Sequence, residues 1–390
     1  MFRRTTGEER QTMMVEIKGV QFINKGAELM LMAVIEQVRD RYPDAEFVLT
    51  NRGAYSTFQS ISRLGCYQKL YINRRGFNLL APAELISKKL LYRFGLVPES
   101  GIDVILDASG FVYHNKGGMP YIRETARRIR KWKRSGKKVI FLPQGFGPFQ
   151  GWRMREWMRT IIDSADLICA RDEVSLEHLN GIKRSEKNAM YPDFTNLVSG
   201  YLPEGYRHLE GRVPIVTNFG MVHWLPQEES RNYVPLMARA LTFFLEAGCE
   251  PYFLMHEDVT DKELVHQIME AAGSEVEIIS ESDPLAVKGI IGASRGVLSS
   301  RFHGLVNALS QGVPALGTGW SHKYEALFSD YQFEEGLLPV TDDQDLLRER
   351  LSFISDERKN SGLRQKLEKR SEIQKELSRK MWSRVFEITA

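Results

Sequence analysis

Short apolar runs alternate with longer stretches of helical periodicity along most of the chain. The first half predicts strands at residues 15–20, 47–50, 104–106, 139–142 and 167–170. After the first strand, Met30, Val34 and Val38 share one face of a helix predicted over residues 27–41. Short buried strands joined by helices must run parallel, so helices are expected on both faces of this sheet.

The same pattern returns after a linker rich in Gly and Pro at residues 196–214. The second half predicts strands at 215–218, 252–255, 276–279, 297–299 and 315–317, and helices at 234–246, 262–271 and 284–293. We therefore predict an α/β fold with two Rossmann-like domains that face each other across a cleft, in a GT-B-like arrangement. Ligands should bind at the carboxyl ends of the strands.

The expected domains cover residues 14–200 and 211–342, and residues 343–390 form a charged tail. The tail predicts a long helix over residues 363–386. We interpret this helix as a packing helix with a solvated face, and its return across the first domain is the specific alternative.

The composition indicates a globular protein with reduced thiols. A chain of 390 residues that is 43% hydrophobic and 10% aromatic can build two packed cores. Cys66, Cys169 and Cys249 are far apart, without metal or redox spacing, which predicts a cytoplasmic protein. Residues 1–11 are too polar for a signal peptide, and no apolar run approaches the length of a membrane span.

Cationic residues gather between positions 123 and 138, although the net charge of the chain is only +3. We interpret this cluster as a solvated helix face. The alternative is contact with an anionic membrane surface or a lipid-linked diphosphate. The cluster consists of Arg123, Arg127, Arg128, Arg130, Lys131, Lys133, Arg134, Lys137 and Lys138.

Another group of polar residues lies where a predicted helix begins, directly after a buried strand at 296–298. Ser299 and Ser300 are N-cap candidates for that helix. The first amides and the dipole of a helix favour an anion, and Arg301 and His303 add cationic groups. The sequence therefore predicts an anionic substrate at this turn.

Residues 299–327, SSRFHGLVNALSQGVPALGTGWSHKYEAL, resemble the C-terminal signature of the polysaccharide pyruvyltransferase family. Further segments resemble the family's other motifs in the same order, which is more specific than one motif alone. They are Asn24, Lys25, Gly26 and Glu28; Pro143, Gln144, Gly145, Gly147 and Pro148; Ala170, Arg171, Asp172, Glu173 and Ser175; and Pro192 with Asp193.

The resemblance implies transfer of the pyruvyl group of phosphoenolpyruvate onto a sugar of a cell-surface or exopolysaccharide precursor as a ketal, with release of phosphate. The N-terminal domain is then the acceptor side and the C-terminal domain the donor side. The acceptor could be lipid-linked and handled at the inner face of the membrane. We expect no cofactor, no metal and no nucleic-acid partner, and the oligomeric state is left open.

Ketal formation needs an acid for the enol carbon, a base for the sugar hydroxyl, and cations for the carboxylate and phosphate. We assign His303 as the general acid and Arg171 as a catalytic cation that binds the donor. The base is left open among Asp193, Asp172, Glu173 and Glu28. The residues assigned to donor binding are Ser300, Arg301, Gly304 and Lys323, together with the first amides of their helix.

The family-like segments follow predicted strands, so they are expected to converge at one rim between the domains. A plainer interpretation as a turn, a cap or an ion pair stands beside each assignment. The residues expected on the acceptor side or in the cleft are Asn24, Lys25, Glu28, Gln144 and Asp193.

Some features depart from this family or point elsewhere. Ala27 stands where the family frequently has an acidic residue, which shifts any such contact to Glu28. A nucleotide-sugar glycosyltransferase would share the two-domain cleft, and a non-catalytic sugar-binding or scaffold protein is a third class. No Walker sequence or dinucleotide fingerprint occurs. The group His256, Glu257, Asp258 and Asp261 is interpreted as a loop and helix cap, not as a metal site.

Overall fold

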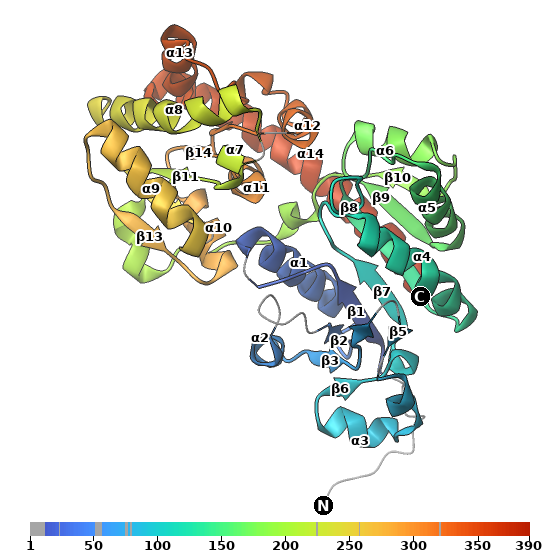
Figure 1. Cartoon of the computed structure of the whole chain (residues 1–390). Coiled ribbons are helices and arrows are strands. Elements are labelled where there is room, and N and C mark those ends of the chain that lie inside the picture. The colour runs from blue at the N-terminus through green and yellow to red at the C-terminus, as the bar shows by residue number, and fades with distance from the viewer. Residues whose placement is uncertain are drawn as a thin grey trace, which may run out of the picture.

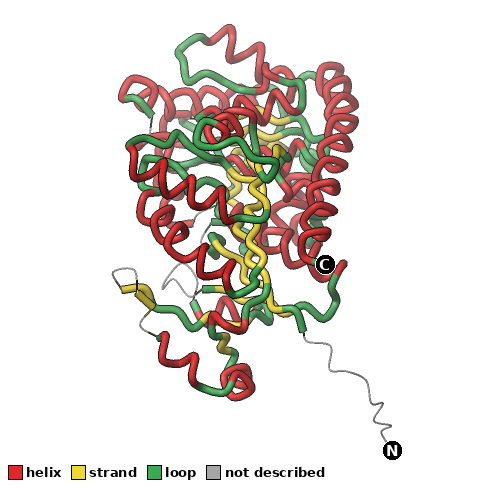
Figure 2. Tube along the Cα trace, turned by 90° about the vertical axis from the view of Figure 1, so that its right-hand side faces the viewer, coloured by secondary structure: helices red, strands yellow, loops and turns green. Residues whose placement is uncertain are grey.

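A computed structural model describes residues 12–22, 24–50, 57–74, 77–78, 80–223, 225–256, 258–319 and 321–390 (Figure 1). The sequence-based interpretations of residues 1–11 and of Glu257 lie outside this range. A view rotated by 90° from that of Figure 1 shows strands through the middle of the molecule and helices on either side (Figure 2). Two parallel sheets, each with its own core, confirm the predicted α/β fold with two Rossmann-like domains.

The sheet of the N-terminal domain has eight strands within the described residues, in the order β10-β9-β8-β7-β1-β2-β3-β6. The chain moves outward from β1 on one side and from β7 on the other, so the strand order reverses between these two. Such a reversal opens a crevice at the carboxyl ends of parallel strands. The strands are β1 (Met14–Lys18), β2 (Glu46–Leu49), β3 (Tyr67–Lys69), β6 (Leu96–Val97), β7 (Val104–Asp107), β8 (Lys138–Gln144), β9 (Leu167–Ala170) and β10 (Asn188–Met190).

Helices cover both faces of this sheet, as expected for parallel strands. Helices α1 and α14 pack on one face, and α4 and α5 on the other. A separate antiparallel pair is formed by β4 (Asn73–Arg74) and β5 (Phe77–Asn78). The helices of this domain are α1 (Lys25–Arg41), α2 (Phe58–Arg63), α3 (Lys88–Arg93), α4 (Met119–Arg134), α5 (Trp152–Ser164) and α6 (Glu173–Asn180).

The sheet of the C-terminal domain is parallel, with the order β13-β12-β11-β14-β15, and reverses between β11 and β14. Its strands are β11 (Val213–Val216), β12 (Pro251–Met255), β13 (Ile278–Ser280), β14 (Val297–Ser299) and β15 (Ala315–Gly317). Its helices are α7 (Gly220–His223), α8 (Gln227–Glu246), α9 (Asp258–Ala272), α10 (Pro284–Gly292), α11 (Phe302–Leu309), α12 (His322–Asp330) and α13 (Gln344–Ser355).

The last helix, α14 (Glu357–Thr389), joins the two domains (Figure 1). Leu363 and Leu367 belong to the core of the C-terminal domain, whereas Met381 and Trp382 belong to the core against α1. The helix therefore returns across the first domain, which was the alternative interpretation of the tail. Among the described residues, no helix combines the length and the apolar character needed to cross a lipid bilayer.

The predicted strands are all present, some with unchanged ends and others with ends shifted by a few residues. Helix α1 begins at Lys25, two residues before the predicted start, and α8 begins at Gln227, seven residues early. The two edge strands β6 and β10, and β3 next to the edge, were not predicted. Each has only two or three residues, so no apolar run marks it in the sequence.

Candidate active site

Residues from both domains meet where the carboxyl ends of the two sheets face each other. Arg171 follows β9, Asp193 precedes a 3₁₀ turn, and His303 lies in the first turn of α11. Arg171 Nη1 donates to Asp193 Oδ2 at 3.2 Å, and His303 Nε2 lies 3.6 Å from the same oxygen. The other carboxylate oxygen of Asp193 accepts bonds from the amide and hydroxyl of Thr195. Asp193 thus contacts a cation of its own domain and the imidazole of the other.

Burial and nearby charges set the protonation of this group. Burial lowers the pKa of His303 to about 4. Asp193 opposes this shift, whereas Arg171, Lys323 and Lys288 reinforce it. The pKa of Asp193 is lowered although burial acts to raise it, because His303, Arg171 and hydrogen bonds outweigh burial. The imidazole is therefore neutral at pH 7, its Nε2 has no hydrogen-bond partner among the described residues, and its side chain is 14% exposed.

The N-terminus of α1 closes one side of the site. Asn24 caps this helix, since its side-chain oxygen accepts from the amides of Gly26 and Ala27. Lys25 Nζ contacts Glu28 Oε2 at 3.1 Å and donates to a backbone carbonyl of the other domain, that of Ser282, at 2.6 Å. Asn24 therefore shapes the turn, and Lys25 ties the two domains together.

Gly26 is where the two domains approach most tightly around His303. A Cβ atom at this position would overlap the His303 ring, although the backbone of Gly26 is ordinary helix. The absence of a side chain here allows α1 to lie directly against the imidazole.

Gly26→Ala is therefore expected to displace the imidazole or the helix and to lower kcat/KM for phosphate release by roughly tenfold to a hundredfold. The same overlap should lower the free energy of unfolding by roughly 1–3 kcal/mol, so thermal unfolding must first show that the variant is folded. Gly362→Ala in α14 is the matched control, since a Cβ there meets nothing within 4 Å. Equal kinetics for the two variants would contradict the close approach of α1 to His303.

Helix α12 brings a second cation to the site. Lys323 Nζ lies 5.6 Å from the ring centroid of Phe111 and 5.3 Å from that of Phe302, so it rests between aromatic rings of both domains. Burial lowers the pKa of Lys323 to about 7, and Arg171 and Arg301 add to the shift. An anion beside Lys323 would favour its charged form.

Arg171 and Lys323 line the same narrow pocket between the domains. The Arg171 guanidinium stacks on the Phe302 ring at 4.1 Å, and its Nε is buried without a hydrogen-bond partner among the residues that the structure describes. Burial raises the pKa of Asp330, in the same pocket, to about 7, and the neighbouring Asp172 contributes. The pocket is also lined by Asp172 and Asp193. The pocket encloses only about 10 Å³, and its two cations face three carboxylates, so binding of an anionic donor there stays a prediction.

Ser300 faces the interior of the C-terminal domain. Its hydroxyl is buried and lies 2.7 Å from both the Tyr233 hydroxyl and the Thr318 hydroxyl. Neither serine caps α11: the N-cap is Arg301, and the expectation for Ser299 and Ser300 is wrong. Ser299 instead accepts from the Arg301 amide. Buried hydrogen bonds within the C-terminal domain engage both hydroxyls.

The Arg301 side chain is also anchored within its own domain. Its Nη2 donates to Asp261 Oδ2 at 2.6 Å, and its Nε donates to the carbonyl oxygen of Thr217 at 3.1 Å. Gly304 packs against Ser299 so closely that a Cβ would overlap the serine hydroxyl. These contacts indicate that Arg301 and Gly304 shape the start of α11, and donor binding by them stays a prediction.

Gln144 lies at the end of β8 with no exposed surface. Its amide nitrogen donates to the carbonyl oxygen of Asp107 at 3.2 Å, and its Oε1 has no partner among the described residues. Gln144 therefore ties β8 to β7 beneath the crevice, and contact with a sugar stays a prediction.

Two further buried titratable side chains lie near the site; the sequence marked His256 only as part of a loop and helix cap, and gave Lys288 no role. His256 follows β12, is 3% exposed and has a buried Nε2 without a partner in the described part of the chain. Burial, Arg301 and His303 lower its pKa to about 3. Lys288 in α10 is fully buried and donates to the carbonyl oxygen of Thr195, across the domain boundary, at 2.8 Å. Neither residue belongs to one of the family-like segments. The only signal in the sequence is that each is a polar residue next to an apolar stretch.

Lys288 is expected to make stability rise with pH. Burial lowers its pKa from 10.5 to about 7, so the unfolded chain binds an extra proton between these values and the free energy of unfolding increases with pH there. In Lys288→Met this contribution, at most about 1.4 kcal/mol per pH unit, should be absent. Urea unfolding from about pH 7 to 9 measures both slopes. Identical slopes for the variant and the native protein would contradict the lowered pKa of the buried Lys288.

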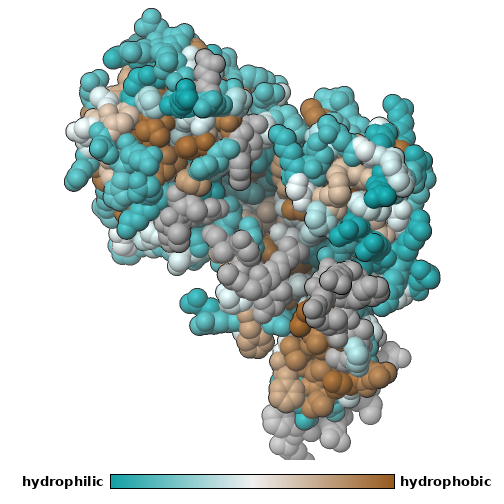
Figure 3. Space-filling view, in the orientation of Figure 1, coloured by the Kyte–Doolittle hydropathy of each residue, from teal (hydrophilic) through white to brown (hydrophobic). Residues whose placement is uncertain are grey.

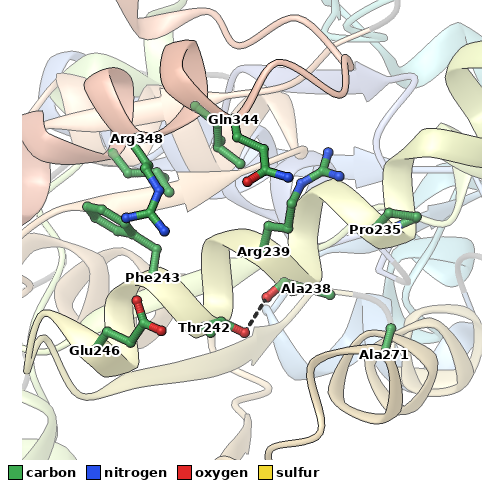
Figure 4. A pocket seen from close by; sticks show the side chains of 11 residues that line it. Pro235, Ala238, Arg239, Thr242, Phe243, Glu246, Ala271, Gln344 and Arg348 are labelled. Carbon is green, nitrogen blue, oxygen red and sulfur yellow. Dashed lines mark hydrogen bonds between the residues drawn. The ribbon is translucent and has the colours of Figure 1, made fainter.

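A separate groove lies in the C-terminal domain, between α8, α9 and α13 (Figure 4). It measures about 450 Å³. Arg239 at its rim pairs with Asp342, and the Thr242 hydroxyl donates to the backbone of the same helix. Arg239 Nε is nevertheless buried without a hydrogen-bond partner in the described part of the chain, and no family-like segment lines this groove. Among the described residues, no group of His, Cys, Asp or Glu side chains is placed to hold a metal ion.

The fold and the crevice define a two-domain α/β protein of the glycosyltransferase-B type with a cationic site between its domains. The chain belongs to the polysaccharide pyruvyl transferase family, whose model matches residues 24–322. No curated protein matches the sequence significantly.

Solved structures share the fold at low sequence identity. Anabaena HepE in complex with UDP and glucose has 13% identity and a TM-score of 0.57, covering 96% of this chain and 100% of that one. UDP-GlcNAc 2-epimerase from Neisseria meningitidis bound to UDP-GlcNAc has 14% identity and a TM-score of 0.54, covering 94% and 99%. Phytolacca americana UGT2 complexed with UDP-2fluoro-glucose and pterostilbene has 12% identity and a TM-score of 0.51, covering 97% and 100%. These likenesses concern the fold alone.

Proposed function

We propose that this protein transfers the pyruvyl group of phosphoenolpyruvate onto two hydroxyls of a sugar in a cell-surface or exopolysaccharide precursor. The observation that carries the proposal is the contact of His303 and Arg171, from opposite domains, with one carboxylate oxygen of Asp193. The family membership supports the same reaction class. The same proposal includes a sugar acceptor that is attached to a lipid carrier.

The reaction adds a proton and two sugar oxygens to the enol phosphate. His303 delivers a proton to the methylene carbon, which becomes a methyl group, and the first hydroxyl adds to the neighbouring carbon as it loses its proton. The carbon–oxygen bond to phosphate then breaks, and the second hydroxyl closes the ketal as its proton leaves. The products are the ketal and inorganic phosphate.

The donor itself supplies the condition for His303 to act as an acid. Its imidazole is neutral in the free protein. An anionic carboxylate and phosphate beside it would raise the pKa of the imidazole, so that the ring becomes protonated. The planar guanidinium of Arg171 can donate two hydrogen bonds to one anionic group of the donor. The ammonium of Lys323 supplies a compact positive charge to the other group. The donor's own charge would therefore offset the cations that now disfavour imidazolium.

We favour Asp172 as the base. Asp193 is engaged by Thr195, Arg171 and His303, and Glu28 is paired with Lys25. Asp172 caps α6 with one oxygen and leaves the other buried and without a partner in the described chain.

The experiment is incubation of the purified protein with phosphoenolpyruvate and a panel of lipid-linked and synthetic sugars. Phosphate release and the mass of a pyruvyl ketal product would support the proposal. The second candidate is a glycosyltransferase that uses a nucleotide sugar, because solved structures of this fold carry UDP. Parallel incubation with UDP-sugars distinguishes the two, since UDP release without use of phosphoenolpyruvate would replace the proposal by this alternative.

A further inference from the structure

A compact apolar surface lies at the far end of the N-terminal domain (Figure 3). Leu85 is 91% exposed and Phe94 is 66% exposed, and Ile86 and Leu90 are also exposed. These four side chains, which we call the α3 face, fall within ten consecutive residues around α3. Clustered large apolar side chains on a surface usually mark an interaction site.

Cations are interspersed among the apolar residues of the α3 face. Lys88, Lys89 and Arg93 are exposed in the same segment. Its one acidic residue, Glu84, uses its carboxylate to accept from the backbone amides of Glu99 and Ser100. The segment thus presents three cations against one engaged carboxylate, mixed with apolar side chains, as in helices that lie in a membrane interface.

The cationic surface of α4 continues from the α3 face. Lys88 Nζ donates to the carbonyl oxygen of Ser100, and Lys131 Nζ lies 3.8 Å from a carboxylate oxygen of Glu99 in the same 3₁₀ turn. Three cations of the predicted cluster are engaged inward: Arg128 pairs with Glu99, Lys133 with Asp166, and Lys137 is buried. The exposed members are Arg123, Arg127, Arg130, Lys131, Arg134 and Lys138.

We propose that the α3 face and the exposed cations of α4 dock on an anionic lipid bilayer. The apolar side chains would enter the interface while the cations contact acidic head groups. A second copy is the weaker occupant, because a two-fold axis through this face would bring like cations together with no free acidic partner in the segment.

The face lies at the opposite end of the sheet from the candidate active site. The C-terminal ends of α3 and α4 precede β6 and β8, so both adjoin the amino ends of parallel strands. The crevice lies at the carboxyl ends. Substitutions in the α3 face should therefore leave the crevice intact, and vesicle binding can be tested independently of the proposed reaction.

The experiment is co-sedimentation of the full chain with phosphatidylcholine vesicles and with vesicles that also contain phosphatidylglycerol. The native protein should bind the anionic vesicles preferentially. Leu85→Ser with Phe94→Ser should reduce binding by roughly tenfold or more. Lys89→Glu with Arg93→Glu should remove the preference for anionic vesicles. The control is Met190→Ser with Ile373→Ser, which removes two exposed apolar side chains outside the face and should bind like the native protein.

Circular dichroism confirms folding of each variant, and light scattering after size exclusion reports the oligomeric state. Native protein that ignores anionic vesicles, or an apolar double variant that binds as well as the control, would overturn the proposal. A native dimer that dissociates in the Leu85→Ser, Phe94→Ser variant without vesicle binding would assign the face to a second copy instead.

Discussion

His303→Asn is expected to lower kcat for phosphate release by roughly a hundredfold to ten-thousandfold. The imidazole is the acid of the proposed reaction, and asparagine fills similar space without a titratable proton. Phosphoenolpyruvate binding should persist, because Arg171 and Lys323 are unchanged. Single-turnover phosphate release and calorimetric binding of the donor measure the two effects separately.

His266→Asn is the matched control, because His266 is exposed on α9 and should leave kcat unchanged. The native protein should also show a rise in the pKa of His303 when the donor binds, measured by NMR of labelled histidine, since the donor adds negative charge beside it. A His303→Asn variant with native turnover would remove His303 from the mechanism, whichever donor the enzyme uses.

Substitutions of Arg171 and Asp193 are expected to shift the pKa of His303 in opposite directions. Arg171→Met removes a cation that disfavours imidazolium and should raise the pKa, whereas Asp193→Asn removes the favourable carboxylate and should lower it. Arg171→Met should also lower kcat/KM by roughly a hundredfold to a thousandfold, because the donor loses its forked partner. Histidine NMR titration and steady-state kinetics measure these effects.

Breaking a buried ion pair costs about 3–5 kcal/mol, so thermal unfolding must first show that both variants are folded. Arg171→Lys keeps the positive charge but not the planar fork, and it should hold the pKa of His303 nearer its native value while recovering little activity. Shifts of the same sign in Arg171→Met and Asp193→Asn would show that the three side chains do not form one electrostatic unit.

The central strands of both sheets were predictable because burial on both faces demands continuous apolar residues. The run at residues 167–170 became β9 with unchanged ends, and the turn after β14 became the start of α11. The edge strand β10 (Asn188–Met190) was missed, since an edge needs no such run. The fold class was therefore predictable from the periodicity of apolar residues, whereas the edge strand β10 was not.

The candidate site was predicted in part. His303, Arg171 and Asp193 were identified from family-like segments, and the structure brings them together. The hydroxyl of Ser300 and the guanidinium of Arg301, assigned to donor binding, make hydrogen bonds within the C-terminal domain, and their contact with a donor stays a prediction. A sequence does not reveal which polar side chains will satisfy one another inside a domain.

The sequence by itself determined the two parallel sheets, the family and the positions of the cationic turns, because periodicity and motif order are local properties of the chain. Only the tertiary structure decided that Gly26 lies against His303, that Lys288 crosses the domain boundary, and that α14 packs on both domains. These contacts join residues far apart in the chain, and they depend on how two separately folded surfaces pack, which no local pattern encodes.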